Sequence, residues 1–292
     1  MTADPFFVHR NLLFTVAYEL LGSAVEAEDV VQDSWLRWAD ADRSQVRDPR
    51  AYLVQIVTRQ SLNRLRSLSR RRESYVGEWL PEPLLTGPDV AENVELAENI
   101  STAMLIVLET LGPTERAVFV LNEVFDVSHH EIAEILGKTS AAVRQIARRA
   151  RDHVAARHPR KRVSRSEQEA VVERFVSALQ TGQLRPLLDV LAPEVVLIAD
   201  GGGLAAAATA PIHGSELVAT MLLRQNRVLS AAVSWINGAP GCRVEVGDHL
   251  ALASFEVEGD RIARIYVVAN PQKLTRQHQP TELANRIKNS PS

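Results

Sequence analysis

The feature that most constrains the fold of this chain is the stretch of residues 128–151, SHHEIAEILGKTSAAVRQIARRAR. Its apolar spacing predicts two short helices joined by a tight turn. Gly137 can end the first helix in the left-handed conformation, and Thr139 or Ser140 can cap the second. Ala133 is small where the second helix must cross closely. The stretch therefore predicts a helix-turn-helix.

The second helix of this unit is strongly basic on its outer face. Val143, Ile146 and Ala150 recur at helical spacing and are expected to face inward. Arginine and glutamine can make paired hydrogen bonds to guanine and adenine edges in a major groove. The alternative is an ordinary helical hairpin with a solvated basic face. The candidate DNA-contacting residues are Ser140, Ala141, Arg144, Gln145, Arg148 and Arg149.

The net charge of −3 conceals separate charged zones. Residues 50–72 contain seven arginines and no acid, and residues 138–165 contain ten basic residues and one aspartate. Between them, residues 73–134 contain thirteen acidic residues and one arginine. Since the local field steers a phosphate backbone, the two basic zones favour a nucleic-acid partner despite the acidic average.

Composition excludes several classes of protein. A hydrophobic content of 46% predicts packed cores, and 292 residues suffice for two or three domains. The single cysteine, Cys242, excludes an intrachain disulfide and suits a reducing cytoplasm. We see no signal peptide at the N-terminus and no run near the about 18 apolar residues of a membrane helix. We therefore expect a cytoplasmic protein with no membrane partner, no metal and no cofactor.

The chain divides into two helical parts and an α+β part. Helices are predicted over residues 6–21, 24–39, 49–72, 93–111 and 113–125, with a Pro- and Gly-containing linker at 76–92. After residue 165 we expect helices at 166–179, 184–191 and 214–229 and a strand at 195–199. Further strands are predicted near 231–236, 242–246, 249–257 and 261–268, separated by Asn-Gly, Gly-Asp and Gly-Asp turns. Strands following helices predict an antiparallel sheet in a separate α+β domain.

Three stretches together resemble a known family. They are AEDVVQDSWLRWAD at 27–40, DPRAYLVQIVTRQSLNRLR at 48–66 and PTERAVFVLNEVFDVSHHEIAEILGKTSAAVRQIARRAR at 113–151. They resemble regions 2 and 4 of extracytoplasmic-function sigma factors, which direct bacterial RNA polymerase to promoters. The resemblance implies a region 2 domain at 1–75, the linker at 76–92 and a region 4 domain at 93–158. Its implied partners are core RNA polymerase and promoter DNA.

The resemblance also implies roles for particular residues. The helix at 24–39 would dock on the polymerase, and the loop at 40–48 with the helix after it would open and read the −10 element. The basic helix of the helix-turn-helix would read the −35 element. The implied polymerase contacts are Asp29, Gln32, Asp33 and Leu36, and the implied −10 contacts are Arg59, Asn63, Arg66 and Arg70.

Three shorter motifs resemble those of sigma factors with a C-terminal SnoaL-like extension. The first is Trp79, Leu80, Pro81, Glu82 and Pro83; the second is Asp200, Gly201, Gly202 and Gly203; the third includes Asn270, Pro271, Lys273 and Leu274. The resemblance implies a cone-shaped α+β domain at 166–292 that modulates the sigma domains. Leu204 and Gln272 stand where a lysine and an acidic residue are expected. A role that needs this lysine, or a salt bridge between loop and tail, is therefore not predicted.

The C-terminal domain leaves a second interpretation open. Cones of this type can hold an apolar ligand pocket, and in cyclases an aspartate serves as acid and base. Asp200 and His213 are the candidate groups for such a pocket. The leading interpretation is a non-enzymatic sigma factor modulated by its own C-terminal domain. The alternative is a stand-alone DNA-binding regulator whose C-terminal domain senses a small molecule or acts like a cyclase.

The basic helix gives a prediction that separates base reading from phosphate binding. Arg144→Ala should weaken binding to the cognate promoter selectively. Arg151→Ala should weaken binding to all DNA and lower the salt slope by about one unit. Titrations of promoter and unrelated DNA across a range of salt concentrations measure both effects. Equal losses on every sequence for Arg144→Ala would exclude base reading by this residue.

Overall fold

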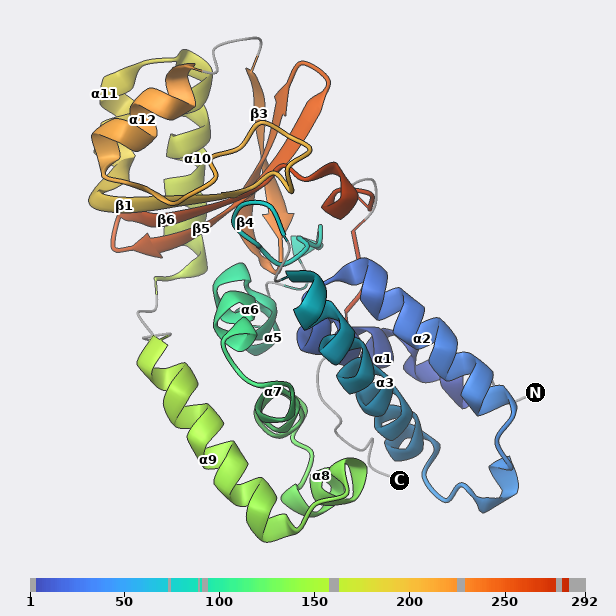
Figure 1. Ribbon diagram of the computed structural model, residues 1–292. Coiled ribbons are helices and arrows are strands. Elements are labelled where there is room, and N and C mark those ends of the chain that lie inside the picture. Colours follow the sequence, from blue (N-terminus) through green and yellow to red (C-terminus); the bar gives the residue numbers. More distant parts are fainter. Residues whose placement is uncertain are drawn as a thin grey trace. The chain divides into compact units, whose positions relative to one another are not determined.

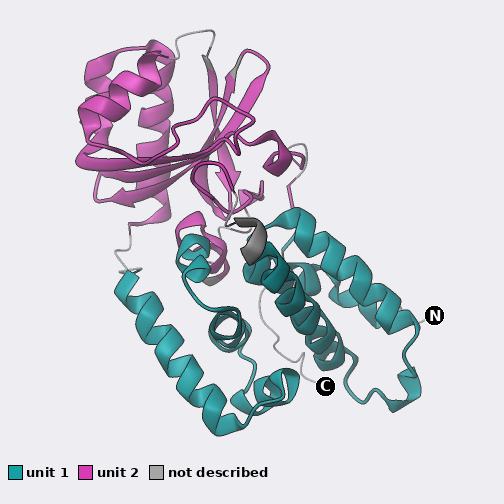
Figure 2. Ribbon diagram, in the orientation of Figure 1, with its two compact units in different colours: residues 1–73, 104–159, 282–292 teal, residues 74–103, 160–281 magenta. Residues whose placement is uncertain are grey.

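The computed structural model describes residues 4–72, 75–88, 90, 94–157, 163–224, 229–276 and 280–283. The chain forms two compact units (Figure 1, Figure 2). Unit 1 comprises residues 1–73, 104–159 and 282–292, and unit 2 comprises residues 74–103 and 160–281. The sequence predicted to be a linker therefore belongs to the same compact unit as the C-terminal domain.

The N-terminal part of unit 1 is a packed set of helices. These are α1 (Pro5–Leu21), α2 (Ala24–Ala39), the short 3-10 helix η1 (Arg43–Gln45) and α3 (Pro49–Arg72). Asp4 and Ser23 cap α1 and α2 with their side chains, and Gly22 ends α1 in the left-handed conformation. α1 is buried along most of its length because α2 and α3 both pack against it.

The second part of unit 1 contains the helix-turn-helix. It is built from α6 (Thr102–Glu109, whose first two residues lie in unit 2), α7 (Pro113–Phe119), the π-helical turn η2 (Val120–Val124), α8 (His129–Leu136) and α9 (Ser140–Arg157). Ser128 and Glu131 form a capping box at the start of α8, and Gly137 ends it with a φ of 62°. Thr139 accepts a hydrogen bond from Ala142 at the start of α9. The expected turn at Gly137 is confirmed.

Two of the predicted helices are interrupted. The helix expected over 93–111 is divided at Ser101 into α5 (Val94–Ile100) and α6. Tertiary contacts explain this break, because Asn237 donates to the Ile100 carbonyl and Thr102 donates to Ser254. The helix expected over 113–125 changes at Val120 into the π-helical turn, in which the Phe125 amide bonds to the Val120 carbonyl.

Unit 2 packs three further helices against one sheet. The helices are α10 (Arg165–Thr181), α11 (Leu184–Val190) and α12 (Ser215–Arg224). The strands are β1 (Leu191–Asp200), β2 (Ile212–His213), β3 (Leu229–Ile236), β4 (Ala239–Val246), β5 (His249–Glu258) and β6 (Arg261–Val268). Apolar side chains of the helices and of one sheet face form the core, in which Phe175 meets Phe255 edge to face.

The sheet is mixed, which corrects the prediction of an antiparallel sheet. Its strand order is β2-β1-β6-β5-β4-β3, and β1 pairs with β6 in parallel. Successive hairpins from β3 to β6 are antiparallel, as their turn sequences predicted. The parallel pair brings together strands that are distant in the sequence, so no local turn signal announces it. This pairing sets the end of β1, at Asp200, beside the end of β6.

No helix of the described residues combines the length and apolar character needed to cross a membrane.

A buried arginine joins the two parts of unit 1. Arg116 of α7 donates from Nε and Nη2 to the Glu19 carbonyl oxygen of α1, at 3.1 and 2.9 Å, and from Nη1 to the Glu109 carboxylate at 2.8 Å. The Glu19 side chain is fully buried, and neither of its oxygens has a hydrogen-bond partner among the described residues. Burial raises the pKa of Glu19 to about 8, an effect that Arg116 only partly offsets.

Glu19 should make the stability of unit 1 depend on pH. The pKa of Glu19 is raised in the folded chain. Its contribution to the free energy of unfolding is therefore complete below the pKa of the unfolded chain, near 4.5, and is lost as the pH rises through about 8. Glu19→Gln should remove this loss, so the variant gains stability relative to the native chain between pH 5 and 8. Urea denaturation at several pH values measures the difference. Glu173→Gln, at an exposed site, is the control, and parallel pH profiles for Glu19→Gln and the native chain would contradict the account.

Candidate functional site

The predicted polymerase contacts lie together on the exposed side of α2. Asp29, Gln32, Asp33 and Leu36 are all exposed, and Leu36 is 57% accessible despite being apolar. Asp29 is not free, because Arg64 of α3 donates to it at 2.9 Å. An exposed leucine among charged and amide groups has the composition of a protein-binding surface.

The predicted −10 residues follow one ridge of α3. Asn63 and Arg66 are exposed and joined by a hydrogen bond of 3.3 Å. Arg59 is directed at the helix-turn-helix, where it donates to the carbonyls of Ile135 at 2.9 Å and Glu134 at 3.3 Å. These carbonyls stand at the end of α8, where a helix attracts positive charge. Arg70 lies in α3, and its side chain is outside the described residues.

The predicted −35 residues line the outer face of α9. Val143, Ala147, Ala150 and Val154 are buried and hold the helix in place, whereas Ile146 is only half-buried. Ala141, Arg144, Gln145, Arg148 and Arg149 are exposed, and Ser140 is half-buried.

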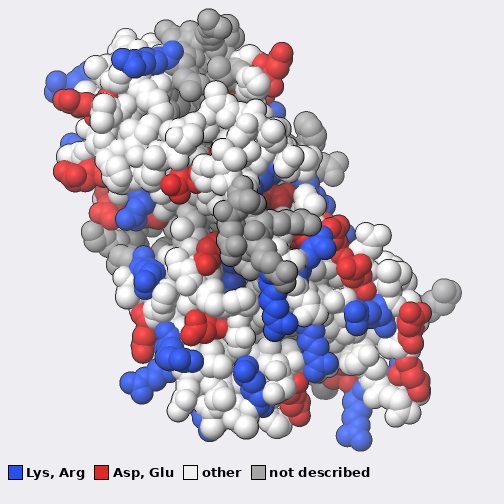
Figure 3. Space-filling view, in the orientation of Figure 1, with Lys and Arg blue, Asp and Glu red and all other residues white. Residues whose placement is uncertain are grey.

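Acidic neighbours accompany several basic side chains of α9. Arg151 donates to Glu123 at 2.6 Å, and Arg149 lies 4.0 Å from Glu115. In the space-filling view, basic and acidic side chains are interspersed over α3 and α9 (Figure 3). Exposed pairs of this kind contribute little stability and can exchange for phosphate contacts.

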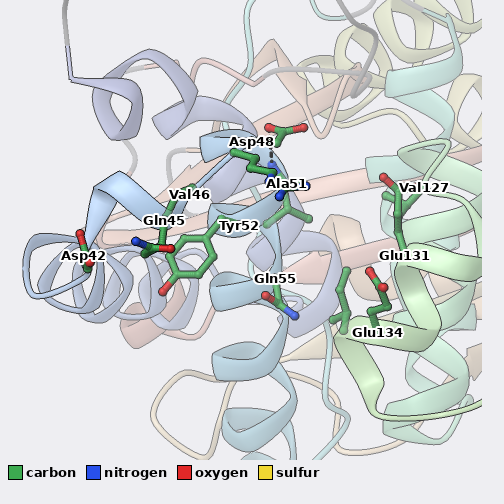
Figure 4. Close-up of a pocket in the computed structure, with 13 residues that line it drawn as sticks. Asp42, Gln45, Val46, Asp48, Ala51, Tyr52, Gln55, Val127, Glu131 and Glu134 are labelled. Atoms are coloured by element: carbon green, nitrogen blue, oxygen red, sulfur yellow. Dashed lines mark hydrogen bonds between the residues drawn. The ribbon is translucent and has the colours of Figure 1, made fainter.

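A cavity of about 560 Å³ opens between the start of α3 and the helix-turn-helix. Loop residues Gln45 and Val46 and helix residues Tyr52 and Gln55 form one wall (Figure 4). Glu131 and Glu134 of α8 lie across from them. Sequence reasoning placed DNA contacts near this loop, but it did not identify Tyr52 or Gln55.

In unit 2, the linker is bonded to the end of β1. Asp200 is fully buried, and its carboxylate accepts from the Leu80 amide at 2.9 Å and from the Tyr75 hydroxyl at 2.5 Å. Burial and this hydrogen bond raise the pKa of Tyr75, so its hydroxyl remains a donor. A buried carboxylate is stable only when such partners satisfy it.

Lys273 completes the site from the C-terminal side. Its ammonium donates to Asp200 at 2.6 Å and to the Leu80 carbonyl at 2.5 Å, and it lies 3.2 Å from the centroid of the Trp79 ring. The lysine is 7% accessible, so its charge is almost wholly desolvated. This ion pair joins the loop to the tail through positions other than Leu204 and Gln272. Leu204 takes no part, being 59% exposed.

A second set of bonds holds the linker at the β3–β4 turn. The buried Asn237 side chain accepts from the Leu84 amide at 2.8 Å and donates to the Ile100 carbonyl at 2.7 Å. The Thr86 amide donates to the Trp235 carbonyl, and its hydroxyl accepts from Gly238. Asn237 was predicted only as a turn residue, because nothing local in the sequence shows that its side chain binds a distant segment.

The three short motifs meet at this linker site. A Cβ on Gly202 would lie 2.2 Å from the Asn270 side chain, so only glycine fits there. Asn270 in turn donates to the Tyr75 hydroxyl at 2.7 Å. Leu80, Pro81, Glu82 and Pro83 are buried, Trp79 and Leu274 are half-buried, and Pro271 is exposed. Tyr75 is the central residue that the motifs did not reveal.

Comparison with known proteins identifies the class. Residues 7–71 match the Sigma-70 region 2 model, and residues 103–154 match the Sigma-70 region 4 model. The chain is 35% identical to the ECF RNA polymerase sigma factor SigJ of Mycobacterium tuberculosis over 96% of this chain and 97% of that protein. It is 30% identical to the probable ECF RNA polymerase sigma factor SigI of the same species, over 91% and 92% of the two chains.

A solved structure agrees with this assignment. The crystal structure of SigJ aligns with 95% of this chain at a TM-score of 0.74 and 32% identity, covering 99% of SigJ. The protein is thus a sigma factor, with two helical sigma domains and a C-terminal domain in which helices pack on a mixed sheet. It belongs to the extracytoplasmic-function sigma factors, which start transcription at promoters together with RNA polymerase.

The Asp200–Lys273 pair should show the energetics of a buried ion pair. Asp200→Asn leaves a desolvated ammonium without its counter-ion and should cost about 3–5 kcal/mol of unfolding free energy. The double variant Asp200→Asn, Lys273→Met should recover part of that loss, because no uncompensated charge remains. Urea denaturation measures both, with the exposed Asp248→Asn as control. Equal stability of the single and double variants would contradict this reading.

Proposed function

We propose that the C-terminal domain regulates this sigma factor by holding the linker between its two promoter-reading domains. In this proposal α2 docks on core RNA polymerase, α3 and the loop before it read the −10 element, and α9 reads the −35 element. The protein acts in the cytoplasm, where polymerase and promoter DNA meet. The observation that carries the proposal is the binding of the linker to Asp200, Lys273 and Asn237.

The binding of the linker by the C-terminal domain, which we call linker capture, limits how far the two DNA-reading domains can separate. The chain leaves the first helical domain at residue 73 and enters the second at residue 104. A free segment of this length could extend by up to about 3.3 Å per residue. Bonds at Leu80, Leu84 and Thr86 instead fix its middle to unit 2. Release of these bonds would let the domains reach elements spaced along a promoter.

The packing within unit 1 supports the same proposal. Two donor groups of Arg59, Nε and Nη2, bond to the α8 carbonyls and are therefore not available to DNA in this arrangement. Glu131 and Glu134 stand at the cavity beside the loop and would repel phosphate. We propose that this packing is a closed state, and that α8 moves away from α3 when promoter DNA binds.

The cavity is our candidate for holding an unstacked base of the −10 element. Tyr52 offers an aromatic face for stacking, and Gln45 and Gln55 offer amide donors and acceptors.

We propose no enzymatic role for the C-terminal domain. Asp200, the candidate acid and base, has its carboxylate occupied by Tyr75, Leu80 and Lys273. His213 is exposed on β2. The comparisons give no support to the alternative of a stand-alone regulator with a cyclase-like or ligand-sensing domain.

Run-off transcription with core RNA polymerase tests the proposal. Trp79→Ala in the full chain removes the ring over Lys273 and should raise transcription from the cognate promoter by about two- to tenfold, because it shifts the linker toward release. Val76→Ala is the matched control, since Val76 lies in the same segment and is 60% exposed. Deletion of residues 166–292 should also change the activity.

Two outcomes would count against the proposal. No transcription by the native chain with any promoter would reject its role in initiation. Unchanged activity on deletion and in Trp79→Ala would reject regulation by the C-terminal domain while leaving the sigma function intact.

A further inference from the structure

We propose that Asp4 is a positioning residue for −10 recognition, because its carboxylate fixes the cavity wall that the 40–48 loop and α3 form together. This inference rests on the proposed role of that cavity in holding an unstacked base. Asp4 directly precedes α1, far in the sequence from the predicted DNA contacts on α3, and none of the motifs includes it.

The carboxylate of Asp4 makes more bonds than a helix cap requires. Oδ1 accepts from the Phe6 amide at 2.9 Å, which caps α1. The same oxygen accepts from the Trp38 indole at 2.9 Å, and Oδ2 accepts from Arg43 Nη1 at 2.9 Å. The last two bonds reach the end of α2 and the start of η1. A residue serving only α1 would not need them.

The bond to Arg43 fixes one wall of the cavity. Arg43 begins η1, and its carbonyl accepts from the Val46 amide at 3.2 Å. Its guanidinium also lies over the Trp38 ring, 5.0 Å from the ring centroid. With its side chain held on two sides, Arg43 holds the backbone that presents Gln45 and Val46 to the cavity.

The bond to Trp38 supports the same wall from the side of α3. Trp38 is 1% accessible, and its ring packs against Tyr52 with centroids 6.1 Å apart. Tyr52 lines the cavity and offers the aromatic face on which a base would stack. Asp4 thus lies behind both the loop part and the α3 part of this wall, and it does not itself line the cavity.

The same contacts predict a small effect on stability. The Asp4 and Arg43 side chains are 22% and 45% exposed, and an ion pair in this setting contributes little to folding. A misplaced wall, in contrast, changes how well a bound base is held. Asp4 should therefore be more important for base discrimination than for the fold.

The experiment measures base discrimination by the holoenzyme. Core polymerase carrying the full chain is titrated with fork-junction DNA from a promoter that the native holoenzyme transcribes. Each −10 position of the non-template strand is replaced in turn by an abasic site. The readout is the affinity of the holoenzyme for the intact DNA divided by its affinity for the abasic DNA. This ratio is taken at the position where the native holoenzyme is most sensitive. Asp4→Ala, Asp4→Asn, Arg43→Ala and the double variant Asp4→Ala, Arg43→Ala are compared.

We expect Asp4→Ala to lower this ratio by roughly 3- to 10-fold, with unchanged affinity for core polymerase. The losses of Asp4→Ala and Arg43→Ala should not add in the double variant, because Asp4 acts on the loop through Arg43. Asp4→Asn keeps the cap and the Trp38 bond, so its affinity ratio should lie between those of the native chain and Asp4→Ala. Ser23→Ala, which removes the α2 cap in the same domain, is the matched control and should leave the ratio unchanged.

The outcomes separate this inference from the function on which it rests. If the native holoenzyme shows no abasic-sensitive position, base capture by the cavity is wrong. If it shows one and Asp4→Ala keeps the native ratio, the positioning role of Asp4 is overturned. A loss in Ser23→Ala as large as that in Asp4→Ala would likewise overturn it, because the effect would then follow from a weakened domain.

Discussion

Regulation in this account depends on one buried ion pair, between Asp200 at the end of β1 and Lys273 after β6. Neither charge could remain desolvated alone, and the parallel pairing of β1 with β6 brings the two strand ends together. The remaining bonding capacity of both groups is satisfied by the linker, through the Leu80 amide and carbonyl. The C-terminal domain therefore completes its own polar core only by binding the segment between the sigma domains.

A related principle holds the two sigma domains together within unit 1. Each domain sends an arginine to the carbonyl end of a helix in the other, Arg116 to α1 and Arg59 to α8. Helix ends attract cations, so both contacts are favourable, but Arg116 is buried whereas Arg59 is exposed. A phosphate backbone offers Arg59 a comparable partner. We therefore propose that promoter binding competes with the closed packing, and that linker capture in unit 2 limits the separation that opening requires.

Local signals explain which features could be predicted from the sequence. The turn at Gly137, the exposed α2 stripe and the hairpins of the sheet follow from caps, helical spacing and turn residues, all of which act within a few positions. The β1–β6 pairing, the Asp200–Lys273 bond and the role of Asn237 join segments far apart in the sequence, where no periodic pattern exists. The family motifs marked Asp200 and Lys273 as important without showing that they meet.

Amide hydrogen exchange of residues 79–86 tests the central claim most directly. In the native chain, the amides of Leu80, Leu84 and Thr86 should be protected, because they donate to Asp200, Asn237 and the β3 backbone. In Lys273→Met these amides should exchange much faster while β4 and β5 keep their protection. Unchanged protection at Leu80 in that variant would contradict the claim that the Asp200–Lys273 pair holds the linker.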